Sequence, residues 1–149
     1  MITIIQRVSQ ASVSVNQQCI GEIGVGIMAL VCVEPMDASK DVSRLLERIL
    51  NYRIFADENQ RMNLSLRDIN GGLLLIPQFT LAADTDKGNR PSFAASAAPE
   101  LGFSLFSELK TLAKAIHPAV QFGEFGADMQ VALINDGPIT FTLRTKCVK

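Results

Sequence analysis

The chain has 149 residues, of which 48% are hydrophobic and 19% charged, and its formal net charge is −1. This balance predicts one soluble globular domain, residues 1–149, large enough to bury a core without disulfides. A protein that holds nucleic acid mainly by neutralising phosphates is expected to be basic, so we expect any contact with nucleic acid to be local. No stretch approaches the roughly 18 uninterrupted apolar residues of a membrane span, and we expect no membrane association.

Cysteine and histidine usage argues against disulfides and metal sites. Cys19, Cys32 and Cys147 are odd in number and widely spaced, which is typical of a reducing compartment, and residues 1–7 do not resemble a signal peptide. We therefore expect a cytoplasmic protein. Cys32 lies in an apolar run without a nearby base, so we expect a core residue and not a nucleophile. The only histidine, His117, precedes a proline, and no metal-ligand spacing occurs, so we expect neither metal nor cofactor.

Short strands are predicted throughout the chain. Residues 11–15 alternate apolar and polar side chains, as a half-buried strand does, whereas residues 27–33 are continuously apolar, as in a strand covered on both faces. Pro77 follows one apolar run and is expected to open the sheet there. The expected strands are residues 2–8, 11–15, 19–23, 27–33, 53–55, 62–66, 73–76, 129–134 and 139–143.

Two helices are predicted from apolar residues at helical spacing. The first is expected to begin at a cap formed by Asp37 or Ser39 and to run to about Tyr52. The second is expected over residues 99–116, with a proline in its first turn and His117 at its end. Two main helices among many short strands predict an α+β fold with a mostly antiparallel, barrel-like sheet.

The segment Asn135-Asp136-Gly137-Pro138 separates the last two apolar runs. Such a cluster is typical of a reversal between two strands, which is the simpler interpretation. However, Pro138 has no N–H and constrains Gly137, so an ordinary two-residue hairpin ladder does not fit. The alternative is a rigid dipeptide that offers its carbonyls to a ligand or a partner subunit.

Taken together, the motifs of this chain resemble those of the D-aminoacyl-tRNA deacylase family, which hydrolyses D-amino acids from mischarged tRNA. Each motif alone is weak, but eight of them follow the family's order over nearly the whole chain. They are Ile5-Gln6-Arg7-Val8, Gly21-Glu22-Ile23-Gly24, Tyr52-Arg53-Ile54-Phe55, Met62-Asn63-Leu64, Gln78-Phe79-Thr80-Leu81, Arg90-Pro91-Ser92-Phe93, Phe125-Gly126-Ala127-Asp128-Met129-Gln130-Val131 and Asn135-Asp136-Gly137-Pro138.

The resemblance implies a homodimer whose two active sites lie at the subunit interface and bind the aminoacylated 3′ end of tRNA. Gly137 and Pro138, joined by a cis peptide bond, would enter the partner's site and turn their carbonyls toward the substrate's α-carbon. An L side chain would collide with them, whereas a D side chain would point away. Glycine has no side chain, so glycyl-tRNA is expected as a secondary substrate.

The resemblance also assigns roles within the site. The catalytic segment would comprise Gln78, Phe79 and Thr80, with Thr80 in contact with the scissile ester. Phe79 and Phe125 would line the pocket and stack on the terminal adenine, although both could be ordinary core aromatics. Arg7 would brace the Gly-Pro segment, or would simply be a surface arginine. Because the sequence offers no convincing base, the expected chemistry uses backbone groups and the neighbouring 2′-hydroxyl of the RNA, and a covalent role for Thr80 is the less favoured alternative.

Two departures from the family pattern stand near this segment. Pro77 replaces the usual serine and supplies neither a hydroxyl nor an N–H, so a serine nucleophile is excluded there. Glu124 replaces a common arginine, and residues 86–90 are less basic than usual, so we expect weaker attraction to tRNA phosphates. Two other functions stay open: a non-catalytic dimeric binding module that kept the fold, and a hydrolase of another small ester or amide.

Overall fold

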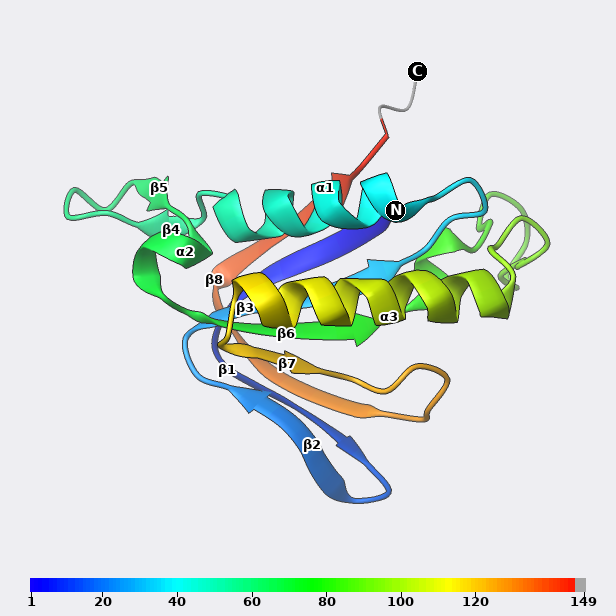
Figure 1. Ribbon diagram of the computed structural model, residues 1–149, viewed down its shortest axis with the longest axis horizontal. Coiled ribbons are helices and arrows are strands. Elements are labelled where there is room, and N and C mark those ends of the chain that lie inside the picture. Colours follow the sequence, from blue (N-terminus) through cyan, green and yellow to red (C-terminus); the bar gives the residue numbers. More distant parts are fainter. Residues whose placement is uncertain (147–149) are drawn as a thin grey trace.

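The computed structural model describes residues 1–146, so Cys147 lies outside the described residues. Three strands open the chain, helices and further strands follow, and α1 and α3 are the two long helices (Figure 1). In chain order they are β1 (Ile2–Val15), β2 (Gln18–Ile23), β3 (Gly26–Cys32), α1 (Ser39–Asn51), β4 (Phe55–Ala56), β5 (Met62–Leu64), α2 (Leu66–Ile69), β6 (Gly72–Pro77), the 3₁₀ helix η1 (Phe79–Ala82), α3 (Pro99–Ile116), β7 (Val120–Phe122) and β8 (Gln130–Arg144).

One six-stranded sheet is organised around β1, which is long enough to pair with three other strands. Its first half pairs with β3 and its second half with β2, while β8 pairs antiparallel with β1 along both halves. The β3–β6 and β6–β7 pairs are parallel. A Cβ placed on Gly21 of β2 would lie 3.3 Å from the Phe122 carbonyl, so β2 closes over β7 and the sheet becomes barrel-like. The predicted α+β class is confirmed, and the two parallel pairs are an addition to the predicted antiparallel sheet.

The sheet carries a core on each face. On one face, α1 and α3 lie side by side (Figure 1) and bury residues such as Leu46, Leu109, Ile27 and Leu75. The second core lies on the opposite face and includes Val8, Val13, Met28, Leu74 and Ile76. The continuous apolar run predicted for the central strand is therefore buried on both sides.

The last strand differs most from the prediction. Residues 129–134 and 139–143 were expected as two strands around a reversal, but β8 is one continuous 15-residue strand. The reversal is wrong because both halves of β8 find partners on the same long neighbour: Leu133 pairs with Ala11, and Phe141 pairs with Ile5. The expected strands over residues 2–8 and 11–15 are likewise one strand, β1, for the same reason.

Two short helices, α2 and η1, were not predicted. Ser65 caps α2, because its hydroxyl accepts from Asp68 N–H and the Asp68 carboxylate accepts from Ser65 N–H, so the expected strand over residues 62–66 ends at Leu64. Beyond Pro77 the chain turns into η1. No helix within residues 1–146 is long and apolar enough to cross a membrane.

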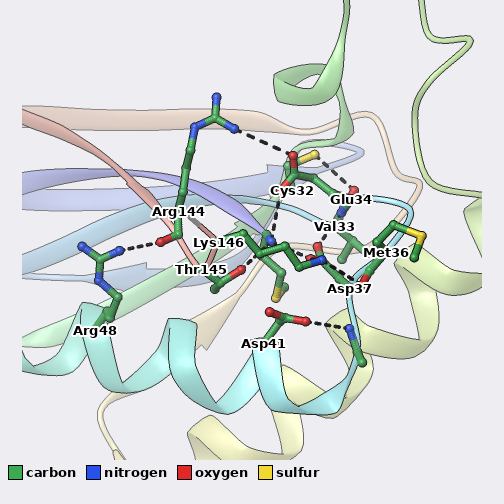
Figure 2. Close-up of polar contacts among 12 residues, drawn as sticks. Cys32, Val33, Glu34, Met36, Asp37, Asp41, Arg48, Arg144, Thr145 and Lys146 are labelled. Carbon is green, nitrogen blue, oxygen red and sulfur yellow. Dashed lines mark hydrogen bonds and ion pairs between the residues drawn. The ribbon is translucent and has the colours of Figure 1, made fainter. Parts of the chain in front are cut away.

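A buried ionic cluster joins the N-terminus to the segment after β3 (Figure 2). The α-ammonium of Met1 lies 2.8 Å from Asp37 Oδ1, 2.8 Å from Thr145 Oγ1 and 3.1 Å from Glu34 Oε2. Asp37 is therefore engaged in an ion pair, and Ser39 is the first residue of the helix, so neither of the two predicted caps occupies the N-cap position of α1. Ala38 occupies the N-cap position, and its N–H donates to Asp41 Oδ2 at 3.0 Å.

Candidate active site

A cleft of about 450 Å³ opens where β3 and β6 end and α3 begins. Three segments that are far apart in sequence form its walls: the strand ends, the residues around the α3 N-terminus, and the approach to β8. Three of the predicted site residues, Gln78, Phe79 and Phe125, line this cleft. The other lining residues are Val31, Val33, Ile76, Pro77, Ser96, Ala97, Ala98, Pro99, Gly102, Phe106, Gly126, Ala127, Met129 and Val131.

The predicted catalytic segment, residues 78–80, begins where the β6 ladder stops. Gln78 N–H donates to the Val31 carbonyl at 2.8 Å, and the chain then enters η1. The Gln78 side-chain amide donates to Thr80 Oγ1 at 2.5 Å, so the amide fixes the position of the Thr80 hydroxyl. Thr80 is exposed beside the cleft, and the Phe79 ring, also exposed, packs against Phe93 with ring centroids 5.2 Å apart.

Phe125 forms the opposite wall and is held by aromatic neighbours. Its ring meets Phe103 edge-on at 5.7 Å and Phe106 at 6.4 Å between centroids. A Cβ on Gly102 would lie only 3.0 Å from the Phe125 ring, so the absence of a side chain in this turn of α3 lets Phe125 approach the helix.

The Gly-Pro segment projects from β8 at another place in the chain. We call residues 136–138 the hook. The Gly137–Pro138 peptide bond is cis, the geometry that the resemblance implies. Arg7 reaches the hook from β1: its Nε donates to the Asp136 carbonyl at 2.9 Å, and its Nη1 donates to the Ile54 carbonyl at 2.9 Å. Gly137 has φ +151°, and a Cβ there would lie 2.5 Å from the Ile139 side chain.

Within one chain, the hook and the cleft are far apart. Arg7 pairs with Ile27, and Ile27 pairs with Leu73, whereas Gln78 follows Pro77 at the other end of β6. Because β8 pairs with β1 on its other side, five residues along a strand and three strand spacings across the sheet separate the hook from Gln78 by on the order of 20 Å. Arg7, Gly137 and Pro138 are accordingly absent from the cleft lining.

Titratable groups contribute little to the cleft. His117 lies at the end of α3, as predicted; it is buried there, and its Nε2 lies 2.8 Å from the Gly71 carbonyl oxygen. Cys32 is buried behind Phe79, and burial together with the nearby Glu34 carboxylate raises the pKa of its thiol to about 11. Within residues 1–146, no group of His, Cys, Asp and Glu side chains is arranged to hold a metal ion.

Sequence reasoning missed Ser96, which lines the cleft just before α3. Among the described residues, its Oγ is the one buried side-chain N or O atom without a hydrogen-bond partner. A buried polar atom in that state is uncommon and calls for a specific explanation. Its neighbours in sequence are alanines, and no motif distinguishes it, because only the folded cleft gives the hydroxyl its position.

Comparison with known proteins agrees with the motifs. The family model described as D-Tyr-tRNA(Tyr) deacylase matches residues 4–144. A protein of Legionella pneumophila (strain Corby) named D-aminoacyl-tRNA deacylase is 54% identical over 97% of this chain and 99% of its own. A protein of Thioalkalivibrio sulfidiphilus with the same name is 57% identical over 96% of each chain.

Solved structures agree as well. One described as c-Myc DNA Unwinding Element Binding Protein superposes with a TM-score of 0.91 at 35% identity, covering 99% of this chain and 100% of that one. Another, described as "a probable eukaryotic D-amino acid tRNA deacylase", has a TM-score of 0.83 at 16% identity, covers 95% of this chain and 97% of that one, and shows the shared fold. From the family match and the identity over nearly its full length, the chain belongs to the D-Tyr-tRNA(Tyr) deacylase family.

Proposed function

We propose that this protein hydrolyses the ester bond of D-aminoacyl-tRNA and releases the free D-amino acid and the tRNA. The observation that carries this proposal is identity of more than half of the residues, over nearly the whole chain, to proteins named for that activity. The cleft beside Gln78 and Thr80, at about 450 Å³, lies within the range of small-molecule sites and suits an aminoacyl group with part of its nucleoside.

The proposed chemistry relies on hydrogen-bond donors near Thr80. Phe79 and Thr80 are in the first turn of η1, where N–H groups have no partner within the helix. Such donors can stabilise the oxyanion that forms during ester hydrolysis. Because Gln78 donates to Thr80 Oγ1, the hydroxyl's own proton is free to turn toward the substrate.

The proposed reaction is assisted by the RNA and not by a side-chain base. A covalent nucleophile at Thr80 would need an adjacent base, and the imidazole of His117 is buried against Gly71 instead. The 2′-hydroxyl beside the scissile ester is the remaining group that can take part. Deleting it from the terminal ribose should therefore reduce the rate strongly.

The proposed selection of D over L uses the hook of a second subunit. In one chain the hook lies on the order of 20 Å from the cleft by strand geometry, so a single copy cannot bring them together. β8, which carries the hook, pairs with β1 alone among the described strands, and Ile134 and Phe141 on it are exposed. An open strand edge with exposed apolar side chains is expected to be covered by another chain. Glycyl-tRNA would pass because it has no side chain to collide with the hook.

Deacylation of D-tyrosyl-tRNA and L-tyrosyl-tRNA, compared under single-turnover conditions, tests the activity. We expect release of D-tyrosine and an intact L ester. Equal hydrolysis of the two esters would overturn the proposed selection. Lasting binding of uncleaved D-tyrosyl-tRNA would instead favour the non-catalytic binding module, and hydrolysis of free D-amino acid esters without tRNA would favour a general esterase.

Subunit mixing tests the shared site. Thr80→Ala should impair the cleft, with an expected loss of about 10²–10³ in rate if an oxyanion contact is disturbed. Pro138→Ala should impair the hook, so that L-tyrosyl-tRNA is also cleaved. A heterodimer of a Thr80→Ala chain and a Pro138→Ala chain has one cleft intact, and the hook that reaches this cleft comes from the Thr80→Ala partner. In an equimolar mixture, cleavage of D-tyrosyl-tRNA should stay at about half of the Pro138→Ala rate. Full exchange should lower cleavage of L-tyrosyl-tRNA from about one half to about one quarter of the Pro138→Ala rate, because half of the intact clefts then meet an intact hook. An unchanged rate on L-tyrosyl-tRNA after demonstrated subunit exchange would contradict the cross-subunit hook.

A further inference from the structure

A second groove of about 540 Å³ adjoins the cleft between α3 and the segment that follows β7. It shares Phe106 and Phe125 with the cleft, so the two hollows are neighbours on either side of these rings. The rest of its lining is Ile20, Phe103, Ser107, Lys110, Gln121, Phe122, Gly123 and Glu124.

Aromatic rings and ammonium groups lie near one another at this groove: Lys110 lines it, and Lys114, outside the lining, lies near the ring of the lining residue Phe122. Phe103, Ser107, Lys110 and Lys114 recur at spacings of four, three and four residues, so they lie on one stripe of α3. The Phe103 side chain is 58% exposed, which is unusual for so large an apolar group beside a cleft. The ammonium groups of Lys110 and Lys114 lie 5.3 and 5.5 Å from the centroid of the Phe122 ring.

Two ammonium groups without carboxylate partners in the described part of the chain lie at this groove, Lys110 in its lining and Lys114 beside it. The chain as a whole carries a net charge of −1, yet neither Lys110 nor Lys114 has a carboxylate partner within residues 1–146. Both ammonium groups are thus available to an anionic ligand. Glu124 lines the same groove and opposes such a ligand.

We propose that this groove binds the single-stranded nucleotides that precede the terminal adenosine of the tRNA. Exposed aromatic rings next to cations are the usual combination for single-stranded nucleic acid, because bases stack on the rings and phosphates meet the cations. A base stacks on Phe103, while Lys110 and Lys114 contact the phosphates. The inference rests on the proposed function, because the terminal adenosine must occupy the cleft for the preceding strand to reach the groove.

Binding of uncharged tRNA, followed by fluorescence anisotropy at several salt concentrations, tests the groove without any turnover. Phe103→Ala should weaken binding on the order of 10-fold, from the loss of one stacked base. Phe103→Leu should weaken it similarly, because an aliphatic side chain fills the space but offers no π-face. Lys110→Ala and Lys114→Ala should each reduce the slope of log affinity against log salt by about 0.7.

Glu124→Gln should change the affinity for tRNA in the opposite direction to the lysine variants. Removing this carboxylate should strengthen tRNA binding, whereas the lysine variants weaken it, and a general loss of folding cannot produce both results. Met62→Ala removes another exposed apolar side chain, and Lys40→Ala another exposed cation, both on elements away from the groove. These two controls should bind tRNA as the wild type does.

Wild-type binding by the Phe103 variants, or shifts in the same direction for Glu124→Gln and the lysine variants, would overturn the inference. A change in oligomeric state with unchanged tRNA binding in Phe103→Ala would assign the groove to a second copy of the chain and would also overturn it. The proposed function fails separately. A wild-type protein that binds tRNA through the groove but releases no D-tyrosine would refute the deacylase proposal and leave the groove in place.

Discussion

The α-ammonium of Met1 lies 2.8 Å from Oδ1 of Asp37, and neither group is exposed. A buried ion pair is not strong evidence of net stability, but removing one partner removes a charge-assisted hydrogen bond. Because Glu34 Oε2 still lies 3.1 Å from the ammonium, we expect Asp37→Asn to lower the free energy of unfolding by about 1.5–3 kcal/mol, measured by urea denaturation. Glu47→Gln is the matched control, because the Glu47–Arg67 pair at 3.0 Å is exposed and should cost less than about 1 kcal/mol. Equal losses in the two variants would contradict this prediction.

Gly26 marks the tightest approach between β3 and β6. A Cβ at this position would lie 1.9 Å from the Gly72 carbonyl oxygen. Gly26 and Gly72 are paired in the β3–β6 ladder, so the two backbones cannot separate without breaking the hydrogen bonds between the strands. Gly26→Ala should therefore prevent folding or yield insoluble protein, as judged by circular dichroism and soluble expression. Gly24→Ala has open space around its Cβ and should fold with a nearly unchanged melting temperature. A well-folded Gly26→Ala protein would show that the parallel strands are not packed this closely.

The two described cysteines should differ in reactivity. Cys32 is buried. Its burial, and to a lesser extent the negative charge of the nearby Glu34 carboxylate, raise the pKa of its thiol to about 11. The reactive thiolate therefore forms only at strongly alkaline pH. Cys19 is exposed. With iodoacetamide at pH 8 we expect mass spectrometry to find Cys19 alkylated and Cys32 unmodified in folded protein. Alkylation of both should follow unfolding in urea, and rapid modification of Cys32 in the folded state would refute the expected protection.

Ser96 offers a separate test of the cleft. Its Oγ is buried without a partner, so Ser96→Ala removes an unsatisfied polar group and should leave the melting temperature unchanged or higher. If the substrate supplies the missing partner, the KM for D-tyrosyl-tRNA should rise by about 5-fold, corresponding to one ordinary hydrogen bond. Ser104→Ala changes an exposed serine of α3 and should alter neither quantity. A lower melting temperature with an unchanged KM would make Ser96 a structural residue.

Local periodicity was sufficient for the long helices and the central strand. The apolar residues of α1 and α3 recur at helical spacing, and both helices were predicted within one or two residues of their observed ends. The uninterrupted apolar run of β3 correctly indicated burial on both faces. In each case the signal lies within the element, because the period of the side chains reports directly which face is buried.

Pairing between distant segments was not predictable in this way. The Asn135–Pro138 cluster has the composition of a reversal, but β1 supplies partners on both sides of it and keeps β8 continuous. Aspartate is a common helix cap, but the α-ammonium of Met1 donates a hydrogen bond to the Asp37 carboxylate instead. For the site, the motifs indicated Gln78, Phe79 and Phe125, whereas Ser96 and the Phe103 groove depend on which side chains meet after folding.

The distance between hook and cleft has a consequence for how the protein would behave at low abundance. Under the proposed arrangement, the groups that hydrolyse the ester belong to one chain, and the hook that excludes L-aminoacyl groups belongs to the other. Dilution below the dissociation constant of the pair would then leave a cleft that is still lined by Gln78 and Phe79 but has no neighbour to exclude the wrong enantiomer. Accuracy, and not only rate, would depend on protein concentration, and stray cleavage of correctly charged tRNA would be the first sign that the subunits had separated.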